Sequence, residues 1–157
     1  MLCITDNNLK LVPLAPKWLN IATEFFSNLQ AQFPMKSLLL VAHGSRRAES
    51  NAEIAVVAKS LSDRVESKYA QTGYAFLELA EPSIPDGIDA LVKNGATDVT
   101  ILPYFLSAGR HVHEDVPEIV NLKKKELNDV NIHIAPYIGE AAEMIDVLVA
   151  ISENENK

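Results

Sequence analysis

The chain has 157 residues, of which 48% are apolar and 22% charged, and its formal net charge is −7. This length suits one globular domain and is too short for two full-sized domains, while the acidic balance argues against general binding to nucleic acid or to an anionic membrane surface. The single cysteine, Cys3, excludes an internal disulfide and suits a reducing compartment. Because no apolar run is long enough to cross a bilayer and the N-terminus lacks a signal-peptide pattern, we predict a cytoplasmic protein.

The first 35 residues differ in character from the rest. Behind Pro16, apolar and aromatic side chains recur at helical spacing from Trp18 to Leu29, which predicts a short amphipathic helix. Its aromatic stripe is expected to pack on the domain or on a second subunit. Met35 stands directly before the first apolar run, so translation starting at Met35 is an alternative.

Strand-like and helix-like segments then alternate four times, which predicts a doubly wound parallel sheet flanked by helices. The run from Leu38 to Val41 is apolar without a break, as is typical of a strand buried on both faces. The further expected strands are Tyr74–Leu79, Val99–Leu106 and Asn131–Ala135, the last at an edge of the sheet.

Helices are expected over Glu49–Tyr69, from Ser83 to Gly95, from about Val116 through Leu127, and from Gly139 through Val149. Ser45 and Ser83 are the predicted N-caps of the first two of these helices, and Gly95 ends the second. The run Lys123–Lys125 is expected to face solvent. The predicted organisation is an extension over 1–35, one α/β domain over 36–152 and a frayed tail over 153–157.

Chemically versatile side chains stand where three of the predicted strands end. The first strand ends at His43, the second at Glu78, and the third leads into His111. Parallel strands bring their carboxyl ends to one edge, where open α/β sheets bind ligands. Two imidazoles and a carboxylate suit a divalent first-row metal or acid–base chemistry. Each residue taken alone has a plainer interpretation as a strand cap or an exposed loop residue, and Glu81 is the alternative to Glu78.

Three motifs resemble the short sirohydrochlorin chelatases, small class II enzymes that insert cobalt, or in some members iron, into sirohydrochlorin. The motifs are His43-Gly44-Ser45-Arg46, the segment 76–83 (FLELAEPS) and the segment 103–117 (PYFLSAGRHVHEDVP). The resemblance covers roughly residues 36–150. It implies a chelatase-like four-stranded sheet, to which residues 1–35 add an extra N-terminal helix.

The resemblance implies that His43, Glu78 and His111 line the metal site and carry catalysis. The neighbouring residues expected to bind the carboxylate-bearing substrate are Gly44, Ser45, Arg46, Ser107, Gly109 and Arg110. Exposed amides at the predicted helix starts add donors for anions, whereas Arg47 is better read as ordinary surface charge. His113 stands where the family often has arginine, so no role is assigned to it.

The implied partners are a sirohydrochlorin-type tetrapyrrole and a divalent metal ion as substrates, with no tightly bound cofactor. Cobalt is the first expectation, and iron and nickel accept the same ligands, so both the cobalamin and sirohaem pathways remain open. Larger members of the class hold two such sheets facing each other, so we expect a homodimer here. A carrier of metal or tetrapyrrole without turnover is the alternative function. A histidine phosphatase is disfavoured, because Ala42 replaces the arginine that such enzymes need before the histidine.

Overall fold

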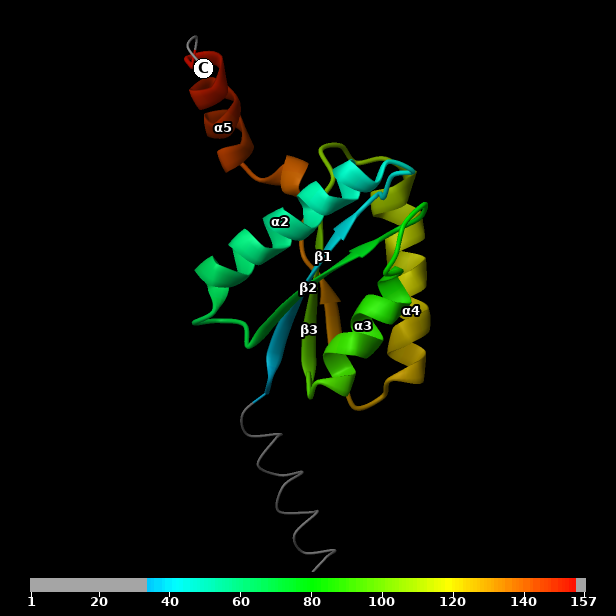
Figure 1. Cartoon of the computed structure of the whole chain (residues 1–157). Helices are drawn as coiled ribbons and strands as arrows, with labels where there is room; N and C mark the ends of the chain where they lie inside the picture. Colours follow the sequence, from blue (N-terminus) through cyan, green and yellow to red (C-terminus); the bar gives the residue numbers. More distant parts are fainter. Residues whose placement is uncertain (1–33, 155–157) are drawn as a thin grey trace, which may run out of the picture. The chain divides into compact units, whose positions relative to one another are not determined.

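Four parallel strands form one sheet in the part of the chain that the computed structural model describes, residues 34–154. They are β1 (Lys36–Ala42), β2 (Gln71–Phe76), β3 (Asp98–Pro103) and β4 (Asn131–Ile134), in the order β2-β1-β3-β4. Every neighbouring pair is parallel (Figure 1). The helix expected between residues 18 and 29 lies outside the described residues.

Helices cover both faces of the sheet, which confirms the predicted doubly wound α/β fold. Helix α2 (Ala48–Val65) packs against β2 on one face, and α3 (Ile84–Lys93) and α4 (Val116–Glu126) lie on the other (Figure 1). A π-helical turn η1 (His111–Asp115) leads into α4. A 3₁₀ turn η2 (Ile138–Glu140) precedes the last helix, α5 (Glu143–Ser152). No helix within residues 34–154 combines the length and the apolar character needed to span a membrane.

The core lies between the sheet and the pair α3 and α4. Strand β1 occupies a central place and is buried from Ser37 to Ala42, as its unbroken apolar run predicts for a strand covered on both faces. In β3, Val99 and Ile101 are buried, as expected of an apolar strand inside the sheet, whereas Leu102 is only partly buried. The core cluster consists of Leu39, Val41, Ala75, Ile84, Ile88, Leu91, Ala96, Val99, Ile101, Val116, Val120 and Ile132.

Strands β2 and β3 each end three residues earlier than predicted. Strand β2 begins at Gln71 and ends at Phe76, so Glu78 follows the strand instead of ending it. The expected start of this strand at Tyr74 is wrong: Gly73 already lies inside β2, where an added Cβ would stand 3.3 Å from Leu39 Cδ1. Glycine therefore serves close packing in the strand interior. Strand β3 ends at Pro103, whose ring nitrogen has no hydrogen to donate to a ladder.

The predicted cap of α3 is confirmed, and that of α2 is wrong. Ser83 Oγ accepts the backbone N–H of Asp86 at 3.3 Å, and Gly95, at φ +97°, follows the end of α3. Helix α2 instead starts after Arg47 with no side-chain cap. Ser45 lies two residues before the N-cap position, where its Oγ accepts the N–H of Arg47 at 3.1 Å.

The lysine run of α4 does not face solvent throughout. Lys123 is 8% exposed and lies between two carboxylates. Its Nζ is 2.7 Å from Asp89 Oδ1 of α3 and 2.8 Å from Glu126 Oε2. These hydrogen bonds raise the pKa of the Lys123 ammonium, against the opposing effect of its burial. Helical spacing turns Lys123 toward α3, which the sequence run alone does not reveal.

Candidate functional site

The structure brings together the three side chains predicted at the strand ends. His43 directly follows β1, Glu78 stands two residues beyond β2, and His111 opens η1 beyond β3. His43 Nε2 is 3.2 Å from Glu78 Oε1. The rings of His43 and His111 pack edge to face, with centroids 4.8 Å apart and planes at 80°. Each of the three side chains is about half exposed (41–52%), so the cluster is open to a ligand.

Both ring nitrogens of His43 have acceptors nearby. Nδ1 lies 3.1 Å from the carbonyl oxygen of Gly44, and Nε2 faces Glu78. Oxygen atoms of this kind only accept hydrogen bonds, so the charged imidazolium can donate to both of them. A metal cation can take the place of the Nε2 proton, because it is also attracted to a lone pair and a carboxylate. The pair therefore suits either a proton or a cation.

Gly44 holds the backbone of Glu78 against His43. Gly44 has φ +94°, and a Cβ added to it would stand 1.8 Å from the carbonyl oxygen of Glu78. The Glu78 N–H donates to the carbonyl oxygen of His43 at 3.0 Å, which continues the pairing of the two chain segments. Gly44 was expected to bind substrate, and its steric role was not visible in the sequence because it depends on a contact 34 positions along the chain.

The alternative carboxylate, Glu81, has a different partner. Its Oε2 accepts the backbone N–H of Ser83 at 2.8 Å, which places it at the start of α3. Glu78 is thus the carboxylate that faces His43. Between them, Leu79 adopts φ 65° and is 50% exposed, a conformation that costs a residue with a side chain roughly 1 kcal/mol.

His111 has a carboxylate partner that the sequence analysis did not single out. Its Nδ1 lies 2.7 Å from Asp115 Oδ2, and the Asp115 side chain is only 24% exposed. Both residues belong to η1, and this i,i+4 spacing is the sequence signal that could have indicated the pair. Residues 111–115 are helical, so His111 and His113 lie two positions apart on one π-helical turn. His113 is exposed.

The arginines fall into two groups. Arg110 Nε lies 3.3 Å from Asp115 Oδ1 and 3.6 Å from Glu114 Oε2, so it faces carboxylates of its own turn. Arg46 and Arg47 are exposed, and neither forms an ion pair within residues 34–154. The two groups therefore differ in how freely they can meet an anionic ligand.

The expected amide donors near Ser45 are already occupied. The Ser45 N–H donates to Asn51 Oδ1 at 2.9 Å, and the Asn51 amide donates back to the Ser45 carbonyl oxygen at 2.7 Å. The Asn51 side chain thus takes the place that the sequence analysis left for an anion. Ser107 and Gly109 lie in the exposed loop after β3, where the Gly109 N–H donates to the Ser107 carbonyl oxygen at 3.0 Å.

The cluster has ligand chemistry suited to a divalent metal but not the geometry of a finished metal centre. Among the described residues 34–154, no group of three or more His, Cys, Asp and Glu side chains is arranged as a ready set of ligands. His43 and Glu78 are in contact, while His111 packs its ring against that of His43 and contacts Asp115 through Nδ1. The three side chains are therefore candidate ligands that do not surround a metal ion on all sides.

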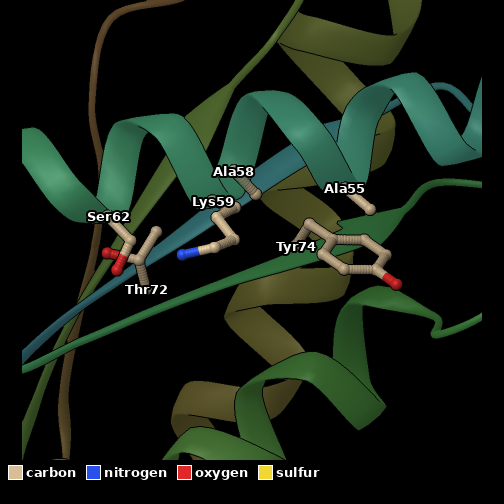
Figure 2. A pocket seen from close by; sticks show the side chains of 6 residues that line it. All are labelled: Ala55, Ala58, Lys59, Ser62, Thr72 and Tyr74. Atoms are coloured by element: carbon tan, nitrogen blue, oxygen red, sulfur yellow. The ribbon is translucent and has the colours of Figure 1, made fainter.

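A surface pocket lies away from this edge, on the α2 side of β2. It has a volume of about 260 Å³, and none of the predicted site residues lines it. Figure 2 shows Lys59, Ser62 and Thr72 near one end of it and Ala55 and Tyr74 near the other. Lys59 Nζ is 3.4 Å from Asp63 Oδ1. The pocket and the cluster at the carboxyl edge are separate features.

Comparison with known proteins places the chain in a family. The CbiX family model matches residues 37–154, and thus all four strands. The chain belongs to the CbiX family. It is 35% identical over 116 residues to the chloroplastic sirohydrochlorin ferrochelatase of Arabidopsis thaliana, which covers 71% of this chain and 48% of the relative. The chain thus spans about half the length of that relative.

Further relatives match the chain in sequence and in structure. The sirohydrochlorin cobaltochelatase of Sulfolobus acidocaldarius is 32% identical over 114 residues, which cover 73% of this chain and 87% of that protein. The sirohydrochlorin chelatase SirB of Bacillus subtilis subspecies spizizenii, solved in complex with cobalt, superposes with a TM-score of 0.69 at 28% identity. This match covers 76% of the present chain and 50% of SirB. The four-stranded chelatase-like fold expected from the motifs is confirmed.

Proposed function

We propose that this protein is a sirohydrochlorin chelatase, which inserts a divalent metal ion into the free-base tetrapyrrole. The observation that carries the proposal is the cluster of His43, Glu78 and His111 at one edge of a CbiX-family sheet. The names of the cobaltochelatase and ferrochelatase relatives support this substrate class. Cobalt is the first candidate for the metal and iron the second, because both accept imidazole and carboxylate ligands.

The chemistry requires a place for two protons. When a divalent ion enters the macrocycle, two pyrrole N–H bonds break, and the two protons leave as the four ring nitrogens bind the metal. A neutral imidazole can hold a metal ion or accept a proton near neutral pH. His43 and His111 are assigned these roles. Glu78, at 3.2 Å from His43, offsets the charge of the ion and passes protons to solvent through its exposed side.

An incomplete ligand set suits an ion that must be released. In a structural zinc site, four protein ligands bind the metal and retain it. A chelatase, in contrast, has to release the ion to the tetrapyrrole ring. The structure places two imidazoles and one carboxylate near one another, and among the described residues no group of three such side chains is arranged to hold a metal ion. Water and then the ring nitrogens fill the remaining positions. The proposal therefore treats the metal as a substrate and includes no resident cofactor.

The surroundings of the cluster suit a flat ring with acidic substituents. Leu79, Tyr104 and Leu106 follow β2 and β3 at the carboxyl edge and are exposed by 50%, 38% and 75%. Apolar side chains at this edge can contact the faces of a macrocycle. Arg46 and Arg47, which form no ion pair within residues 34–154, can meet its carboxylates. Arg110 is the weaker candidate for binding these carboxylates, because it already forms ion pairs with Asp115 and Glu114.

A second copy of the chain is proposed to face the first, so that the tetrapyrrole binds between the two sheets. Every residue of α5 is at least partly exposed, and five of its large apolar side chains are among the most exposed in residues 34–154. They are Ile145, Val147, Leu148, Val149 and Ile151. Exposed apolar surface of this extent marks an interaction site. SirB, of which the chain matches half, supports a second domain-sized unit as the occupant.

The direct test mixes the purified protein with sirohydrochlorin and Co²⁺ and follows the absorbance of the ring. A chelatase converts many equivalents of substrate per protein above the spontaneous rate. A carrier that binds the metal or the ring without turnover would stop at one equivalent. No acceleration beyond stoichiometric binding would therefore reject the enzyme and favour the carrier.

A further inference from the structure

Asp115 contacts one of the two ring nitrogens of His111. Asp115 Oδ2 lies 2.7 Å from His111 Nδ1. A carboxylate accepts and does not donate, so Nδ1 must carry the hydrogen of this bond. When the ring is neutral, Nε2 then holds the lone pair. Nε2 is thereby left as the ring nitrogen that can bind a metal ion or accept a proton.

The π-helical turn fixes the carboxylate in this position. The turn places His111 and Asp115 four residues apart, and the Val116 N–H closes it by donating to the carbonyl oxygen of His111. Turns of this kind occur often at functional sites. The second carboxylate oxygen, Oδ1, is 3.3 Å from Arg110 Nε. Asp115 is thus held through both oxygens, one toward His111 and one toward Arg110.

The neighbouring carboxylate does not share this arrangement. Glu114 is 71% exposed, and its Oε2 is 3.6 Å from Arg110 Nε. His111 is paired with Asp115 and not with Glu114. Two adjacent acidic residues therefore contact the same arginine, and one of them also contacts the site histidine.

We propose that Asp115 is a positioning residue for metal insertion, which fixes the hydrogen of His111 on Nδ1 and presents Nε2 to the site. The inference rests on the proposed chelatase function and adds a residue to it. Carboxylate partners of this kind orient metal-binding histidines, and their loss lowers metal affinity or activity by about 10- to 100-fold. Arg110 acts through Asp115, which gives it a role besides direct contact with substrate.

The substitution Asp115→Asn makes a distinctive prediction because of Arg110. The guanidinium only donates, so it attracts the amide oxygen of the new side chain. The amide NH₂ group is then directed at His111, where it can only donate to Nδ1. The hydrogen of His111 is expected to move to Nε2, which blocks the nitrogen needed for catalysis. Asp115→Ala lacks any partner for Nδ1 and should give a mixture of the two tautomers.

The test reads the tautomer without metal or substrate. Long-range ¹H–¹⁵N correlation spectra of histidine-labelled protein at alkaline pH distinguish Nδ1–H from Nε2–H, and His111→Gln identifies the signal among the four histidines. The wild type should show Nδ1–H at His111, and Asp115→Asn should show Nε2–H. Glu114→Gln removes the same charge beside Arg110 and should leave the His111 signal unchanged.

Rates of Co²⁺ insertion into sirohydrochlorin then connect the tautomer to function. The insertion rate of Asp115→Asn is expected to be about 10- to 100-fold lower than that of the wild type. The rate of Glu114→Gln should remain within a few-fold of the wild type. An Nε2–H tautomer in the wild type, or a full rate in Asp115→Asn despite a moved hydrogen, would overturn the inference. If the wild type shows Nδ1–H but no insertion at all, the proposed function fails and so does the assigned role of Asp115 in it, while its control of the tautomer stands.

Discussion

Gly44 sets how closely the Glu78 backbone approaches His43. A Cβ at position 44 would lie 1.8 Å from the Glu78 carbonyl oxygen, and φ +94° is unfavourable for any residue with a side chain. Gly44→Ala must therefore push the segment after β2 away from the cluster. We expect an insertion rate at least about tenfold lower, as for other losses of site geometry, and a free energy of unfolding lower by about 1–3 kcal/mol.

Insertion assays and urea unfolding check this prediction. Gly109 provides the matched stability control, because an added Cβ there meets nothing within 4 Å. Gly109→Ala should leave the urea midpoint unchanged. A Gly44→Ala protein with normal stability and a normal rate would show that the close approach of the Glu78 backbone is unimportant.

Residues at strand ends could be predicted, and their partners could not. His43, Glu78 and His111 stand out in the sequence because each follows an apolar run, and parallel strands share one carboxyl edge. The choice between Glu78 and Glu81 needed the hydrogen bond of Glu81 to Ser83. Asn51 occupies the Ser45 amide through a side-chain contact six residues away. Such contacts depend on local geometry that hydrophobic patterns do not encode.

At the scale of elements, Lys123 joins α4 to α3. Its ammonium lies 2.7 Å from Asp89 of α3, and its side chain is 11% exposed. Lys123→Met keeps the apolar stem and removes the charge. We expect a free energy of unfolding lower by about 1 kcal/mol, because the two carboxylates remain half exposed and can be hydrated. Lys124→Met, on the exposed side of α4, is the control and should change the stability little.

The effect of Lys123→Met should depend on pH in one direction. The hydrogen bonds with Asp89 and Glu126 raise the pKa of Lys123 above its ordinary value of 10.5. The charged lysine therefore stabilises the folded state fully below that value, and its contribution disappears as pH rises through the higher folded-state pKa. Urea titrations should show a constant difference between wild type and variant from pH 6 to about 9, which shrinks only in stronger alkali. A difference that already fades below pH 9 would contradict the assignment.

The order and type of the described elements followed from periodicity, whereas several boundaries did not. Four strands and the intervening helices were expected in the observed sequence order. The shift of β2 by three residues arises because Gly73 packs inside the strand against Leu39, although glycine in a sequence is more often a sign of a break. The prediction of Ser45 as the N-cap of α2 was wrong, because a serine near the start of a helix can also form a turn ahead of the helix.

At the scale of the whole molecule, α5 carries the proposed contact between two copies. Its large apolar residues are exposed, with Ile145 at 64% and Leu148 at 55%. Replacing both with glutamate should prevent burial of this face and convert a dimer into a monomer, because an unpaired charge is costly to bury. Light scattering at micromolar concentration measures the change. The conservative double variant Ile145→Leu and Leu148→Met should remain dimeric, and a monomeric wild type would contradict the proposed assembly.

The rate of Co²⁺ insertion into sirohydrochlorin is the most direct measure of whether His43 acts in metal insertion. After subtraction of the spontaneous reaction, His43→Ala should be slower than the wild type by about tenfold to several thousandfold, the scale of losing a positioned base or ligand. His113→Ala should stay within a few-fold, and both variants should unfold at the wild-type urea concentration. A full rate without His43 would contradict its role in insertion. An equally severe loss at His113 would contradict the choice of His111 over His113 as the second site histidine.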